Sequence, residues 1–144
     1  MKTFSDNVAR SFNQARYLAA VQLLICTLFL PGCQSPFLVF PGGALPGEPA
    51  TTDSFAFAKD HLILKLEVNP AAPYSVILRT TVIEGDLYID AAKKRKWWRL
   101  LAEQNNVRLG IGDKVYNAVA TPVINKEIVE RFRKGRIIYR LDPQ

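Results

Sequence analysis

Four consecutive cations at Lys93–Lys96 are the side chains whose type and spacing most directly suggest chemistry. They open a stretch over 93–104 in which Trp97 and Leu101 share one side, so the pattern predicts an amphipathic helix. The first N–H groups of a helix lack partners within it and the helix dipole makes that end positive, so an anion is favoured there. Three interpretations stay open: a bound anion, anionic lipid headgroups, or a solvated helix start.

Two other groups of residues could contribute to such a site. Trp97 and Trp98 are neighbours, so on a helix they point roughly 100° apart and cannot both enter one core. We expect Trp97 in the core and Trp98 more exposed, where it could cover a pocket. Arg79 lies in a strand-like run and either receives an anion inside the domain or pairs outward with Glu67 or Asp90.

Hydrolytic and metal chemistry are disfavoured. His61 is the only histidine and has no histidine or cysteine cluster beside it, so we expect no metal site. No Gly-x-Ser-x-Gly, Gly-x-Gly-x-x-Gly or phosphate-loop motif occurs, and Gly110 and Gly112 belong to a predicted hairpin. The sequence therefore offers no catalytic residue.

Apolar alternation and turn residues define the elements that must position these side chains. A second, short helix begins at Asn125, which can cap it, and continues to Phe132. Because the connections are short, neighbouring strands must be mostly antiparallel, which predicts a mainly β domain with two short helices, built as a small barrel or sandwich. Six strands are expected, at 62–68, 74–83, 87–90, 107–111, 115–123 and 136–141.

The first third of the chain is typical of a processing signal. The apolar run Tyr17–Leu30 follows a positively charged leading segment and is shorter than the roughly 20 residues of a spanning helix. It ends in Leu-Pro-Gly-Cys, which resembles the lipobox of bacterial lipoproteins and implies lipidation at Cys33. The alternatives are an ordinary cleaved signal or an uncleaved anchor. The residue after Cys33 is Gln34, whereas an aspartate at that position would resemble an inner-membrane retention signal. The expected location is therefore the outer membrane, facing the periplasm.

This interpretation divides the chain into three parts. Residues 1–32 form the removed signal, 33–52 a tether rich in proline and glycine, and 53–144 the folded domain. Phe37–Phe40 puts apolar bulk into the tether, so part of it should pack on the domain or lie at the lipid surface. Cys26 falls in the signal, which leaves the domain no disulfide. The net charge of +6 is a mild excess that does not indicate nucleic acid binding.

Three short stretches resemble a known group of proteins. The segment 82–90, the pair Lys96-Trp97 and the segment 107–116 look like the pyridoxamine-phosphate-oxidase-like and deazaflavin-dependent nitroreductase proteins. The resemblance covers about Phe55 to Asp142. It implies a six-stranded antiparallel split β-barrel, commonly a homodimer, that binds FMN or a deazaflavin with its phosphate near the start of the helix.

Carried over by position, the resemblance also implies which residues hold that cofactor. The expected cofactor-binding residues are Arg79, Thr80, Thr81, Lys93, Lys94, Arg95, Lys96 and Trp98. Two functions follow as alternatives: a membrane-anchored lipoprotein acting as a small flavin- or deazaflavin-dependent oxidoreductase, or a non-catalytic envelope module that keeps the barrel without a cofactor. Haem stays open as a ligand, with His61 the only histidine available.

Overall fold

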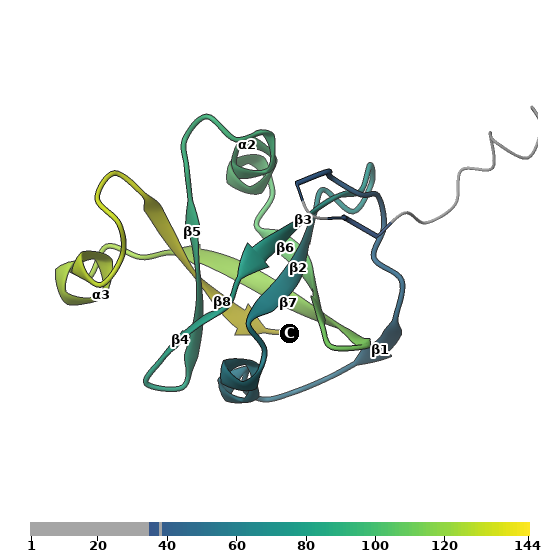
Figure 1. Cartoon of the computed structure of the whole chain (residues 1–144), viewed down its shortest axis with the longest axis horizontal. Coiled ribbons are helices and arrows are strands. Elements are labelled where there is room, and N and C mark those ends of the chain that lie inside the picture. The colour runs from purple at the N-terminus through teal and green to yellow at the C-terminus, as the bar shows by residue number, and fades with distance from the viewer. Residues whose placement is uncertain (1–34, 38) are drawn as a thin grey trace, which may run out of the picture. The chain divides into compact units, whose positions relative to one another are not determined.

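The computed structural model describes residues 35–37 and 39–144, so the predicted signal and Cys33 lie outside the described residues. In the described part, no helix combines the length and the apolar character that crossing a membrane requires. Figure 1 shows a strongly curled sheet with small helices around it. Its elements are β1 (Glu48–Ala50), the 3-10 helix η1 (Ala56–Asp60), β2 (Ile63–Val68), β3 (Tyr74–Arg79), β4 (Thr81–Ile83), β5 (Asp86–Ala91), α2 (Lys96–Glu103), β6 (Asn106–Ile111), β7 (Lys114–Pro122), α3 (Lys126–Glu130) and β8 (Ile137–Pro143).

The sheet follows the order β3-β2-β6-β7-β8-β5-β4, with every neighbouring pair antiparallel. The two ends of this path, β3 and β4, are separated in the chain by Thr80 alone. The sheet must therefore curl until its ends approach each other, which gives an open half-barrel (Figure 1). The predicted fold class, mainly β and antiparallel with two short helices, is confirmed.

The predicted number of six strands is wrong, because the sheet formed by the described residues has eight. The apolar run 74–83 reads as one strand, but the chain turns a corner at Thr80 and its two halves pair with different neighbours, β2 and β5. The additional strand is β1, which lies in the proline- and glycine-rich segment and pairs in parallel with β7. Three residues are too few to show the alternation of apolar and polar side chains that predicts a strand.

Residues 42–50, which we call the strap, lie on the barrel. Gly42 exchanges two backbone hydrogen bonds of 2.9 Å with Ser75 of β3, and Leu45 is buried. The Leu45 N–H donates to the Glu67 carboxylate at 2.5 Å. Glu67 is itself only 1 % exposed and is bound by Arg108 at 3.0 and 3.1 Å. The buried Glu67 carboxylate and the partly exposed Arg108 therefore join β2, β6 and the strap.

The core fills the inside of the curl. Alternate residues of β2 point inward, as the pattern predicted, and α2 closes the core with Trp97 and Leu101. The helix begins at Lys96 instead of 93, because the chain first makes a turn in which the Arg95 N–H donates to the Ala92 carbonyl at 3.0 Å. A smaller apolar cluster packs under α3, whose predicted cap is confirmed: the Asn125 side chain accepts from the Glu127 N–H at 2.9 Å.

Candidate functional site

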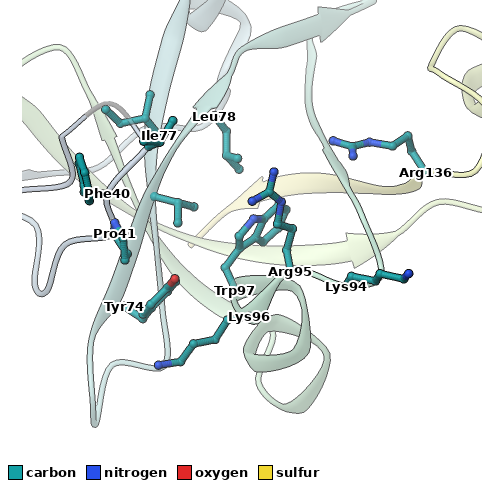
Figure 2. Close-up of a pocket in the computed structure, with 12 residues that line it drawn as sticks. Phe40, Pro41, Tyr74, Ile77, Leu78, Lys94, Arg95, Lys96, Trp97 and Arg136 are labelled. Atoms are coloured by element: carbon teal, nitrogen blue, oxygen red, sulfur yellow. The ribbon is translucent and has the colours of Figure 1, made fainter.

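A pocket of about 420 Å³ lies beside β3, the turn before α2 and the start of the strap (Figure 2). Its volume falls in the range of roughly 300–1,000 Å³ that is usual for ligand sites. One side is apolar and the other is cationic, and no aspartate or glutamate is among the described residues that line it. The lining residues are Val39, Phe40, Pro41, Tyr74, Val76, Ile77, Leu78, Lys94, Arg95, Lys96, Trp97 and Arg136.

The cationic side comes mainly from the turn between β5 and α2. Lys94, Arg95 and Lys96 follow the end of β5 and are all exposed, so their charged ends remain free to meet a ligand. The Lys96 Nζ lies 4.7 Å from the centroid of the Tyr74 ring, a cation–π contact that ties the helix start to β3. Free N–H groups in the first turn of α2 add to the positive potential.

Arg136 completes this side, and sequence reasoning missed it. Pairing of β5 with β8 sets Ala91 opposite Ile137, so Arg136 reaches the turn that follows β5. Asp90 holds it there: the Arg136 Nε binds the Asp90 carboxylate, and its Nη2 donates to the Asp90 carbonyl at 3.2 Å. Only the strand register brings these distant segments together, so no local motif could have identified Arg136.

The structure separates the predicted cofactor residues into two places. Lys94, Arg95 and Lys96 line the pocket, with Lys93 exposed beside them but outside the lining. The run Arg79–Thr81 lies beyond the pocket lining, where β3 ends and β4 begins. Of this run, Arg79 is exposed and sits opposite Ile63 in the register. The expected alternative partners of Arg79 are engaged elsewhere, Glu67 by Arg108 and Asp90 by Arg136.

The two tryptophans have different surroundings. Trp97 is 6 % exposed and belongs to the core, as predicted, and its ring also forms part of the pocket wall (Figure 2). Trp98 is half-buried and lies outside the pocket lining, where its Nε1 donates to the Tyr139 hydroxyl at 3.1 Å. The wall of the pocket is therefore provided by the inward tryptophan.

Other polar groups in the described residues surround two further cavities of similar volume. No three histidine, cysteine or carboxylate side chains in the described part gather in a way that could hold a metal ion. One of these cavities, of about 440 Å³, lies between β1 and β7 beside Arg108, and the other, of about 400 Å³, lies beside Tyr88 and Arg140 near α3. Burial and the neighbouring Asp86 carboxylate raise the pKa of the Tyr88 hydroxyl, and the Asp142 carboxylate raises the pKa of Arg140. Both groups keep their usual charge near neutral pH.

Comparison with solved structures identifies the fold. A protein from Listeria innocua, provisionally assigned as a pyridoxamine 5'-phosphate oxidase, aligns with a TM-score of 0.52 at 15% identity, over 62% of this chain and 89% of that one. A NimC/NimA family protein from Clostridium acetobutylicum aligns at 0.49, with 16% identity over 60% and 74%. HutZ, the heme storage protein from Vibrio cholerae, aligns at 0.48, with 16% identity over 61% and 85%.

The likeness to the Listeria innocua protein shows that the two chains share a split-barrel fold, as the sequence resemblance predicted. At this level of identity they show the fold alone. No protein-family model and no curated protein sequence matches the chain. The function must therefore be argued from the pocket itself.

Proposed function

We propose that this protein is an envelope lipoprotein, anchored through Cys33, whose split barrel binds FMN or a deazaflavin and acts as a small oxidoreductase. The observation that supports the ligand is the convergence of Lys94, Arg95, Lys96 and Arg136 on one side of a pocket whose other side is apolar. A ligand suited to this arrangement carries an anionic group at one end and a flat apolar body at the other.

The residues present fit such a cofactor. The cations Lys94, Arg95, Lys96 and Arg136 would hold its phosphate, because charge-assisted hydrogen bonds are among the stronger polar contacts in proteins. Tyr74, Leu78 and Trp97 would cover its ring and exclude water from one face. When bound, a flavin supplies reversible electron transfer to a small acceptor. This chain would contribute binding and orientation of the cofactor.

The absorption spectrum tests the proposal. The purified full chain, kept in mild detergent, is incubated with FMN, a deazaflavin or haem and then desalted. We expect a retained flavin band. The double variant Lys94→Glu/Lys96→Glu should fold normally and lose retention, and Arg136→Ala should weaken binding about tenfold or more, the usual scale for a lost hydrogen bond to a charged group.

A matched control keeps the charge change but moves it away from the pocket. Lys126→Glu/Lys134→Glu alters exposed residues in and after α3, outside the pocket lining, and should retain the cofactor as the wild type does. A clean protein spectrum under every condition would refute cofactor binding. It would favour the second candidate, a non-catalytic envelope module, with which the exposure of Lys93–Lys96 is also compatible.

A further inference from the structure

Three apolar side chains project into water just before the strap. Phe37 is 69 % exposed, Val39 90 % and Phe40 67 %, and together we call them the apolar tip. Single exposed apolar residues are common on protein surfaces, but neighbouring ones of this size usually mark an interaction site. The tip therefore needs a partner with an apolar interior.

The tip is held in place by the backbone. The Phe37 N–H donates to the Phe40 carbonyl at 3.2 Å, and the Phe40 N–H donates back to the Phe37 carbonyl at 2.9 Å. Two residues further on, Gly42 is bonded to Ser75 of β3. These bonds constrain the backbone of the tip beside β3, so less backbone entropy is lost when its side chains are buried.

The apolar tip lies beside the cationic turn. Val39 and Phe40 line the same pocket as Lys94, Arg95 and Lys96, so apolar and cationic side chains stand around one opening. Lys93 extends the cationic group, and all four cations are exposed. This combination matches the surface of a bilayer, whose acyl boundary accepts aromatic and aliphatic side chains while anionic headgroups attract lysine and arginine.

We infer that the apolar tip and Lys93–Lys96 together form a membrane-docking edge, which seats the barrel on a bilayer containing anionic lipid with the pocket opening toward it. Charge complementarity selects this partner over an apolar protein groove, because four adjacent cations would lose solvation there without a matching anion. The inference does not require lipidation. It is compatible with an anchor at Cys33, since an extended chain spans at most about 3.6 Å per residue and Phe37 follows that cysteine closely.

Tryptophan quenching tests the docking in the full chain. Both tryptophans, Trp97 and Trp98, belong to the first turn of α2, so they report on this edge and on no other part of the sequence. The protein is mixed with, or reconstituted into, vesicles of phosphatidylcholine and phosphatidylglycerol whose acyl chains carry bromine close to the headgroups. We expect strong quenching of the emission, which weakens when phosphatidylglycerol is omitted or the salt concentration is raised.

Two variants separate the apolar and the cationic contributions. Phe37→Ser should lower the docking equilibrium constant, obtained from the bromine quenching, at least about fivefold, because an aromatic side chain is no longer withdrawn from water. Lys94→Glu/Lys96→Glu should lower it at least about tenfold. Lys126→Glu/Lys134→Glu, with the same change in charge, should behave as the wild type does, and emission without bromine checks that each variant is folded.

Unquenched wild-type emission, or equal quenching of the wild type and the Lys94→Glu/Lys96→Glu variant, would overturn the inference. Two single variants distinguish a failure of membrane docking from a failure of the proposed cofactor site. Phe37 lies outside the pocket lining, so Phe37→Ser should reduce docking while cofactor retention is unchanged. Arg136→Ala should reduce cofactor retention while docking is unchanged.

Discussion

Replacing Glu67 should release the strap and destabilise the whole barrel. This carboxylate is 1 % exposed, accepts two contacts of 3.0 and 3.1 Å from Arg108, and accepts the Leu45 N–H at 2.5 Å. In Glu67→Ala the guanidinium and the amide both lose their acceptor. The strap would then keep only the Gly42–Ser75 bonds, the burial of Leu45 and the pairing of β1 with β7.

The expected cost can be worked from these contacts. Breaking a buried ion pair by removing one partner costs about 3–5 kcal/mol, but the Arg108 side chain is 31 % exposed, so water reduces its share. Adding about 1 kcal/mol or more for the unpaired Leu45 amide gives a loss of about 3–4 kcal/mol for Glu67→Ala. Glu67→Gln keeps an acceptor for Leu45 and should cost about 1–2 kcal/mol. Either loss is a large part of the about 5–15 kcal/mol that is typical of a domain.

Urea denaturation of the full chain, followed by tryptophan emission, measures these losses, and hydrogen exchange at the Leu45 amide measures release of the strap. Glu84→Gln is the matched control, because Glu84 pairs with Arg131 on the surface and exposed pairs contribute little. The reasoning is refuted if Glu67→Gln costs no more than Glu84→Gln, or if Leu45 exchanges equally slowly in Glu67→Ala and in the wild type.

Three further predictions follow from the structure. Gly47→Ala should destabilise the protein by about 1–3 kcal/mol in the same urea assay, because the new Cβ would lie 2.7 Å from the Val115 side chain at a φ of 149°; an unchanged midpoint would contradict this. The raised pKa of Tyr88 means that the unfolded chain loses this proton first, so stability should fall as the pH rises through about 10 and beyond. Tyr88→Phe should lose less stability over that alkaline range, measured by urea midpoints at stepped pH, and parallel curves would exclude this origin. Cys33→Ala should release the protein from the membrane fraction if Cys33 carries the lipid, as measured by fractionation of cells; persistent association would indicate an uncleaved anchor.

Much of the fold could be predicted because it is encoded locally. Alternating residues in β2, the glycine turn before β7 and the Asn125 cap each act over a few positions. The corner at Thr80 escaped prediction because β-branched residues continue through it without interruption. β1 escaped because its parallel pairing with β7 depends on a partner far along the chain.

The site was predictable only where one segment supplies it. Lys94, Arg95 and Lys96 are neighbours in sequence, so their shared position on the pocket followed from the chain itself. Arg136, the β3 wall and the residues just before the strap, Val39 to Pro41, reach the pocket through strand register and backbone pairing. The Glu67–Arg108 pair was likewise hidden, since a glutamate in an alternating strand reads as a solvent-facing residue.

The position of β8 in the sheet bears on how this protein can be made. β8 is the latest of the described strands to be synthesised, yet it is the one that joins β7 to β5. Until it emerges, β5 and β4 have no connection through the sheet to β3, β2, β6 and β7. The pairs β2–β3, β2–β6, β6–β7 and β4–β5 do not need β8, but the two parts of the sheet can join only after β8 has been made. Such non-local closure is slow, so the joining of the two parts of the sheet should come late in folding.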